Sequence, residues 1–232
     1  MSVDTDIFYV IIILYIPISE RKNFHMQEYV MGNGAIALGA LAAGVNLVAG
    51  YPGTPSSEIL ETISKYRHDG VYIEWSVNEK AAMEVAAAAA YSGARAMVTM
   101  KQVGLNVAAD PLMSLAYVGV KGGMVIVSAD DPGPISSQTE QDTRRFADFC
   151  RIPVFDPSSP EEAYKMIGEA FEYSEKYNTP VLFRPTTRVC HAYASIDNCD
   201  SPSPKKYEGF VKDSKKWVIF PRLSFANHIM IE

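Results

Sequence analysis

The chain has 232 residues, of which 48% are hydrophobic and 21% charged, a composition typical of one globular domain with extensions. The formal net charge of -6 is spread along the sequence without a long basic run, which argues against a nucleic-acid partner. The three cysteines, Cys150, Cys190 and Cys199, are odd in number and widely spaced, which argues against a disulfide scaffold and an iron–sulfur cluster site and favours a cytoplasmic location.

The N-terminal segment contains an unbroken apolar run, IFYVIIILYI, at residues 7–16. A membrane-spanning helix needs roughly 20 apolar residues, so this run predicts no membrane anchor. A signal peptide would need a basic start, whereas Asp4 and Asp6 precede the run. We therefore expect residues 1–30 to be an extension without a functional role, and Met26 or Met31 to be the more natural start.

From Gly34 onward, segments with helical periodicity alternate with short apolar segments bounded by turn residues. The segments with strand character lie at residues 46–51, 71–75, 96–100, 123–128, 153–155 and 181–184. The segments with helical character lie at residues 35–44, 58–65, 78–91, 103–117, 142–150 and 160–177. This order predicts an α/β fold: a three-layer sandwich with a mostly parallel sheet of about six strands.

The composition changes after about residue 188, and SPSPKK at residues 201–206 is typical of a polar linker. The tail at 217–232 carries WVIF and further apolar residues and then stops. We expect residues 190–232 to be a linker and the start of a following region that is cut short.

One carboxyl group, that of Glu79, lies where a strand gives way to an alanine-rich helix. Open α/β sheets bind ligands at the carboxyl ends of their strands, so Glu79 is a candidate site residue. The alternative is a carboxylate that only favours the helix N-terminus, worth about 0.3–1 kcal/mol. The alanine run itself predicts close packing of the helix against the sheet or a second subunit.

Two further segments bring polar groups to the same edge of the predicted sheet. The turn PGTPSS at 52–57 offers free N–H groups and hydroxyls at a helix start, which suits a carboxylate or phosphate ligand as well as an ordinary capped turn. Residues 100–106, MKQVGLN, follow another strand, and Gly104 leaves room for a ligand to approach the backbone.

A resemblance to a known family extends from residue 31 to about residue 189. The stretches that carry it are GNGAIALGALAAGV, YPGTPSSEI, EWSVNEKAAMEVAAAAAYSGARAMVTMKQVGLNVAADPL and SADDPGPISSQTEQDTRRFADFCRIPVFDPSSPEEAY. They resemble the N-terminal, pyrimidine-binding domain of the α subunit of indolepyruvate:ferredoxin oxidoreductases, which belong to the thiamine-diphosphate-dependent 2-oxoacid:ferredoxin oxidoreductases. The resemblance implies a thiamine-diphosphate-binding fold for residues 31–189.

The resemblance also implies a reaction, the oxidative decarboxylation of aryl 2-oxoacids such as indolepyruvate to an acyl-CoA, with electrons passed to ferredoxin. In such enzymes an acid at the place of Glu79 hydrogen-bonds the aminopyrimidine ring of the cofactor and promotes its imino tautomer. The implied pocket also includes Thr54 and Pro55 in the YPGTP motif, and Lys101, Gln102 and Asn106 beyond the strand. The family pattern tends to read KHVGLN here, so no acid/base role of that histidine transfers to Gln102.

The family's other functional regions have no counterpart in this sequence. The GDG...N signature that holds magnesium and the diphosphate is missing, and so is the cysteine-rich region that holds 4Fe-4S clusters. The chain is thus expected to supply half of the thiamine diphosphate site, to contain no metal site, and to be inactive alone. The expected partners are a diphosphate-binding domain, the β subunit, ferredoxin and coenzyme A.

Two other functions compete with this interpretation. Residues 32–37, GNGAIA, match the relaxed G-x-G-x-x-[G/A] pattern of nicotinamide-binding enzymes. That motif requires an acid at the end of the next strand, where this sequence has Gly50, Tyr51 and Pro52. The other alternative is a non-catalytic assembly or interaction module derived from such an oxidoreductase, which the missing cofactor-binding regions favour.

Overall fold

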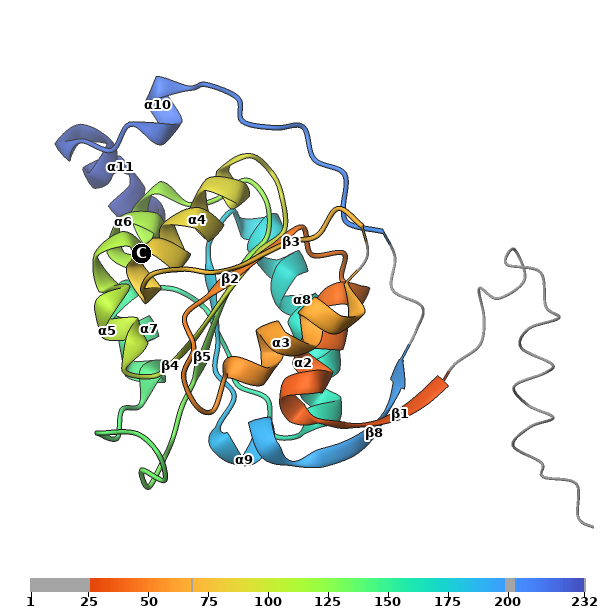
Figure 1. Ribbon diagram of the computed structural model, residues 1–232. Coiled ribbons are helices and arrows are strands. Elements are labelled where there is room, and N and C mark those ends of the chain that lie inside the picture. The colour runs from red at the N-terminus through yellow and green to blue at the C-terminus, as the bar shows by residue number, and fades with distance from the viewer. Residues whose placement is uncertain (1–25, 68, 199–202, 232) are drawn as a thin grey trace, which may run out of the picture.

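The computed structural model describes residues 26–67, 69–198 and 203–231, and the apolar run at 7–16 lies outside these ranges. A parallel sheet with the strand order β3-β2-β4-β5-β7-β6 forms the middle layer (Figure 1). Its strands are β2 (Leu47–Gly50), β3 (Tyr72–Trp75), β4 (Ala96–Lys101), β5 (Met124–Ala129), β6 (Val154–Phe155) and β7 (Val181–Phe183). The predicted α/β sandwich with six parallel strands is confirmed.

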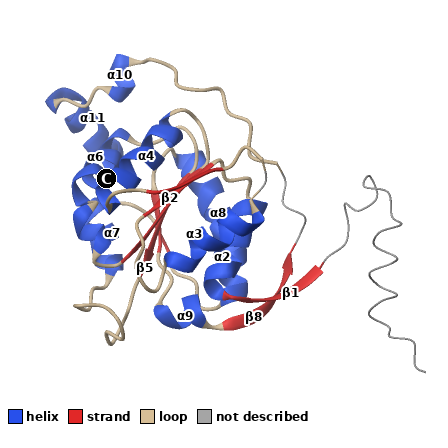
Figure 2. Cartoon of the chain, viewed as in Figure 1, coloured by secondary structure: helices blue, strands red, loops and turns tan. Residues whose placement is uncertain are grey.

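Helices cover both faces of this sheet (Figure 2). One face is covered by α2 (Gly32–Ala42), α3 (Ser57–Tyr66) and α8 (Pro160–Tyr177), which bury one hydrophobic cluster against the strands. The other face is covered by α4 (Glu79–Tyr91), α5 (Gly104–Val107), α6 (Ala109–Val118) and α7 (Thr143–Cys150), which bury a second cluster. Because both faces are covered, the central strands β4 and β5 are almost wholly buried and consist of apolar runs.

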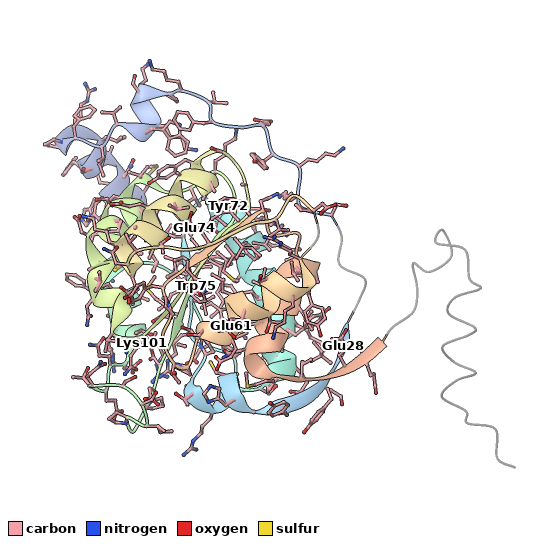
Figure 3. The ribbon with its side chains drawn as sticks, viewed as in Figure 1. Glu28, Glu61, Tyr72, Glu74, Trp75 and Lys101 are labelled. Atoms are coloured by element: carbon pink, nitrogen blue, oxygen red, sulfur yellow. The ribbon has the colours of Figure 1, made fainter. Side chains whose placement is uncertain are left out.

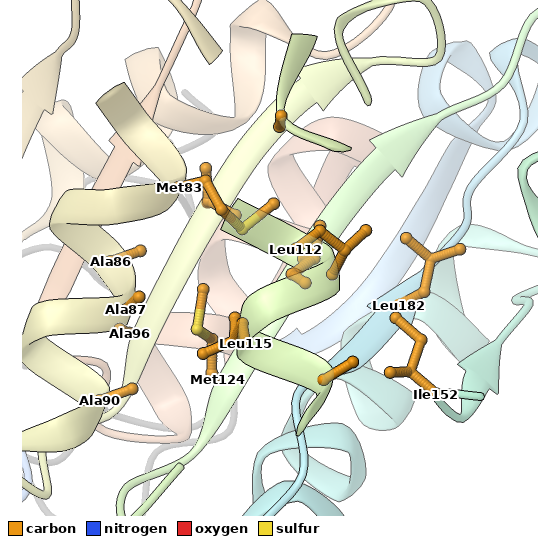
Figure 4. Close-up of a cluster of buried hydrophobic side chains, with 14 of the residues drawn as sticks. Met83, Ala86, Ala87, Ala90, Ala96, Leu112, Leu115, Met124, Ile152 and Leu182 are labelled. Carbon is orange, nitrogen blue, oxygen red and sulfur yellow. The ribbon is translucent and has the colours of Figure 1, made fainter. Parts of the chain in front are cut away.

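The alanine-rich helix α4 packs directly on the sheet. Ala82, Ala86 and Ala90 are fully buried beside Met83, and Figure 4 shows this face of α4 turned toward α6 and the strands. Small side chains let the helix backbone approach the strands closely. This contact confirms the packing role predicted for the alanine run and fixes the start of α4 at the sheet edge.

The single helix predicted at 103–117 is instead two helices, α5 and α6, which meet at Ala108. Pro111 accounts for the break, because it has no N–H to donate to a carbonyl one turn earlier. With α6 beginning at Ala109, the proline lies in the first helical turn, where an N–H would have no partner within the helix.

A separate antiparallel ribbon joins β1 (Met26–Met31) to β8 (Tyr193–Asn198), which follows the short helix α9 (Thr187–His191). Val30 and Ile196 turn one face of the ribbon toward α2 and α8, while Tyr29 and Tyr193 stack on the other face. Sequence reasoning did not foresee these strands, which extend into the segments predicted as extension and linker. The domain bounds 31–189 stay a prediction.

The C-terminal segment passes the amino ends of the strands before it forms α10 (Ser214–Trp217) and α11 (Pro221–Ile231). The side chain of Asn46, which precedes β2, donates to the Lys205 carbonyl at 2.7 Å, and the Lys205 N–H donates to the carbonyl of Gly44. This part of the predicted linker is therefore packed. Across the described ranges, the structure contains no helix with the length and apolar character needed to cross a membrane.

Candidate functional site

The candidate site lies at the carboxyl edge of the parallel sheet. The ends of β2 and β3 are in register, since Gly50 pairs with Trp75. Gly50 also pairs with Thr99, so β4 extends two residues further, to Lys101, which pairs with Ala129 at the end of β5. Figure 3 labels Trp75 and Lys101 at two of these strand ends. The loops after four strands therefore converge on one edge, where ligands bind in open α/β sheets.

Glu79 is the first residue of α4 and is only 7% exposed. Asn78 fixes this helix start, because its side chain accepts a hydrogen bond from the N–H of Ala81 at 2.8 Å. Among the described residues, no side chain or backbone group forms a hydrogen bond or ion pair with the Glu79 carboxylate. The carboxylate oxygens are not among the fully buried atoms without a partner, so they are accessible at the sheet edge to a ligand that donates a hydrogen bond.

Gly104 makes room for the Glu79 carboxylate. A Cβ added at Gly104 would lie 2.5 Å from Glu79 Oε1 and 2.7 Å from its Cγ. The contact places the start of α5 directly against Glu79. From the sequence, Gly104 was expected to leave room for a group near the backbone. In the structure, the group that approaches Gly104 is the Glu79 carboxylate.

The turn after β2 brings Thr54 and Pro55 to this edge, with Thr54 exposed and Pro55 buried around a cis peptide bond. The aliphatic stem of Lys101 lies against Gly53, where an added Cβ would be 3.0 Å from Lys101 Cδ. The structure therefore brings the turn and the stem of Lys101 together. Ser56 occupies the N-cap of α3, but its hydroxyl donates to the carbonyl of Gly53 instead of capping the helix.

Gln102 is fully buried, and both ends of its amide are bound within the chain. Its Nε2 donates to the Thr139 carbonyl at 2.6 Å, and its Oε1 accepts from the N–H of Asp131 at 2.7 Å. The predicted pocket residue thus fastens the loop that follows β5. Its place in a cofactor pocket stays a prediction, and the amide acts in this structure as a support.

Asp131 organises the same loop from within. Its Oδ2 accepts from the N–H groups of Ile135, Ser136 and Ser137, and its Oδ1 accepts from the Thr187 hydroxyl at 2.8 Å. Burial raises the pKa of this carboxyl, but the four hydrogen bonds outweigh burial and lower it to about 2. The loop is therefore held around a charged anchor at neutral pH.

Asp131→Asn should lower the free energy of unfolding at neutral pH, and this loss should become smaller as the pH falls. A carboxyl with a pKa of about 2 in the folded state and about 3.9 when unfolded stabilises the fold above roughly pH 4, and this contribution disappears as the pH falls toward 2. The difference in unfolding free energy between wild type and variant should therefore shrink from pH 5 to pH 2, as measured by urea unfolding. The exposed Asp148→Asn serves as the control, and a pH-independent difference would contradict the expectation.

Asn106 is exposed, two residues beyond the Gly104 that contacts Glu79. It lines a hollow shared with Gln141, Arg145 and Phe149, and Glu79 does not contribute to that hollow. Of the predicted residues, Thr54, Pro55 and Lys101 lie together, Glu79 meets the α5 start, Gln102 faces inward, and Asn106 opens to the surface.

Sequence reasoning missed a buried ion pair beside this edge. Arg184 Nε lies 2.7 Å from Asp130 Oδ2, and the Asp130 carboxylate also accepts from the N–H and hydroxyl of Thr143. Arg184 further contacts Asp156 after β6. The signal was present in the sequence, because two consecutive acids follow the apolar strand β5 and an arginine follows β7.

The structure argues against the nicotinamide alternative. A strand does end at Met31, but it pairs antiparallel with β8 outside the parallel sheet. A Cβ on Gly32 would collide with the Val189 carbonyl, so the start of α2 packs against α9 and leaves no room for a pyrophosphate. In the described part of the chain, no group of three or more His, Cys, Asp or Glu side chains could hold a metal ion.

Comparison with known proteins supplies independent information. The family model described as pyruvate flavodoxin/ferredoxin oxidoreductase, thiamine diphosphate-binding, matches residues 38–216. The chain is 48% identical over 207 residues to the indolepyruvate oxidoreductase subunit IorA of Thermococcus kodakarensis, and this match covers 87% of the chain and 32% of that subunit. The corresponding subunit of Archaeoglobus fulgidus is 49% identical over 177 residues, which are 74% of the chain and 28% of that subunit.

A solved structure shares the fold at low sequence identity. It is a 2-oxoglutarate:ferredoxin oxidoreductase from Magnetococcus marinus with 2-oxoglutarate, coenzyme A and succinyl-CoA bound, with a TM-score of 0.67 and 17% identity over 82% of this chain and 37% of that one. The chain thus spans about a third of the length of the curated indolepyruvate oxidoreductase subunits that it matches.

Proposed function

Because this chain belongs to the thiamine-diphosphate-binding family of pyruvate flavodoxin/ferredoxin oxidoreductases, we propose that it carries the cofactor-activating glutamate, Glu79, of a 2-oxoacid:ferredoxin oxidoreductase. The observation that supports this role most directly is the position of Glu79: the residue is only 7% exposed at the sheet edge, and its carboxylate has no hydrogen-bond or ion-pair partner among the described residues. Such a group suits a heteroaromatic ring that offers a hydrogen-bond donor. Thiamine diphosphate, when bound, supplies the chemistry that removes carbon dioxide from a 2-oxoacid.

The chain's own residues have distinct tasks in this proposal. Glu79 holds and shares a proton at its carboxylate, which Gly104 keeps at the sheet edge. The stem of Lys101 lies against Gly53, and its ammonium group donates to Gln138 Oε1 at 3.3 Å, so it adds positive charge at the sheet edge that attracts an anionic substrate or cofactor group. The buried side chain of Gln102 holds the loop after β5 in place.

The substrate and partners follow from the relatives and are part of the proposal. The two curated relatives described above are named as indolepyruvate oxidoreductase subunits, which favours aryl 2-oxoacids such as indolepyruvate as substrates. Coenzyme A, ferredoxin and the β subunit complete the proposed reaction in the cytoplasm. We infer that magnesium, the diphosphate and the 4Fe-4S clusters are held by regions outside this chain, which matches only 32% of the Thermococcus kodakarensis subunit.

A chimera tests this function. The matched third of the Thermococcus kodakarensis subunit is replaced by this chain, and the chimera is produced anaerobically with the partner subunit. We expect coenzyme-A-dependent reduction of a viologen dye by indolepyruvate, faster than by pyruvate or 2-oxoglutarate. A folded, assembled chimera that binds thiamine diphosphate but reduces no dye would contradict the proposal and favour the assembly module.

A further inference from the structure

We propose that Asn33 is a positioning residue that fixes the turn carrying Thr54 and Pro55, and this inference rests on the proposed function for the importance of that turn. Asn33 is the second residue of α2 and is fully buried. Its Nδ2 donates to the Pro55 carbonyl at 2.6 Å and to Glu58 Oε2 at 2.9 Å. One amide therefore ties the start of α2 to both the turn and the first turn of α3.

The two acceptors explain why the residue is an asparagine. The Pro55 carbonyl and the Glu58 carboxylate both need a donor, and the NH2 group of a short amide supplies two donors from one atom. Rotating the amide by half a turn would place Oδ1 against two oxygens, so the orientation is fixed. The residue's position is fixed too, because every residue from Gly32 to Leu41 is buried and Gly32 packs on Val189.

The unpaired amide oxygen of Asn33 lowers the stability of the fold, which indicates that stability alone does not explain an asparagine at this position. Asn33 Oδ1 is buried and has no hydrogen-bond partner among the described residues, which is costly. An apolar side chain would avoid that cost but would leave the turn unfastened. The consequence reaches the site, because Gly53, two residues before Pro55, lies against the stem of Lys101.

The test is Asn33→Asp, which keeps the shape and replaces the donor with a second acceptor. Hydrogen exchange should rise about tenfold or more at the Gly53 and Ser56 N–H groups, which are bonded within the turn, and stay unchanged in β4 and β5. In the chimera, the KM for the 2-oxoacid should rise about tenfold with a smaller change in kcat. Adding Glu58→Gln restores a donor opposite the new carboxylate and should recover part of both effects.

Asn46→Asp is the matched control, because Asn46 is also a buried amide with two hydrogen bonds but lies at the amino end of β2. It should lower the melting temperature without changing exchange in the turn or the KM. Equal effects of the two variants on the turn and the KM would show that Asn33 is only structural. If Asn33→Asp alone does not fold, its combination with Glu58→Gln is compared with Asn46→Asp instead. A wild-type chimera without activity would overturn the proposed function, while the exchange result would still decide whether Asn33 fastens the turn.

Discussion

Glu79→Gln should lower the rate of indolepyruvate-dependent dye reduction by the chimera at least about 100-fold, because an amide keeps the shape but cannot share a proton. The melting temperature should not fall, since no hydrogen bond or ion pair to this carboxylate exists among the described residues. The rate is measured anaerobically at saturating substrate and coenzyme A.

Glu84→Gln is the control for this experiment, because Glu84 lies on the same helix but is exposed. It should retain the wild-type rate. Near wild-type activity of Glu79→Gln would mean that Glu79 is only a carboxylate at a helix end, and the proposed activation site would then be wrong.

Gly104→Ala should also lower the rate of dye reduction strongly, although it leaves the carboxyl group of Glu79 chemically unchanged. The added methyl group would lie 2.5 Å from Glu79 Oε1, so the carboxylate must move. Gly168→Ala is the control, because its methyl group would meet only Ala43 Cβ at 4.0 Å. Equal rates for the two alanine variants would show that the position of Glu79 is not critical.

Arg184→Met should destabilise the chain by about 3–5 kcal/mol, because it leaves the fully buried Asp130 carboxylate without its cation. Arg184 joins the ends of β5, β6 and β7 through Asp130 and Asp156, so the loss acts on the sheet itself. The unfolding free energy is measured by urea denaturation at pH 7.

Arg144→Met provides a matched comparison. Arg144 also pairs with Asp156, but 52% of its side chain is exposed, and exposed ion pairs contribute about 1 kcal/mol or less. A loss of similar size in both variants would mean that burial of the Asp130–Arg184 pair has no special effect.

The sequence predicted the layered fold because its signals are local and repeated. Apolar strands such as β4 and β5 alternate with helices whose ends are marked by capping residues, for example Asn78 and Asp142. The ribbon of β1 and β8 was missed for the opposite reason. Its partners are far apart in sequence, and each strand alone is short and mixed in polarity.

The candidate site shows the same division. The position of Glu79 was predictable because this acid follows a strand and starts an alanine-rich helix, while its role is implied by the family resemblance. The inward direction of Gln102 and the donors of Asn33 were not predictable, because their partners Thr139 and Pro55 lie on other loops. The direction in which a polar side chain points depends on tertiary contacts, and the periodicity of a sequence carries no information about such contacts.

The ribbon has a practical consequence for protein engineering. Met26 and Asn198 are a cross-strand pair, so their Cα atoms are separated by about 4.5–5.5 Å, although the chain beyond this pair returns to pack on the α/β unit at Lys205 and through α11. A cassette running from Met26 to Asn198 would therefore occupy no more space at its junction than a hairpin does. Such a cassette could be grafted into a surface loop of a carrier protein without stretching the host backbone.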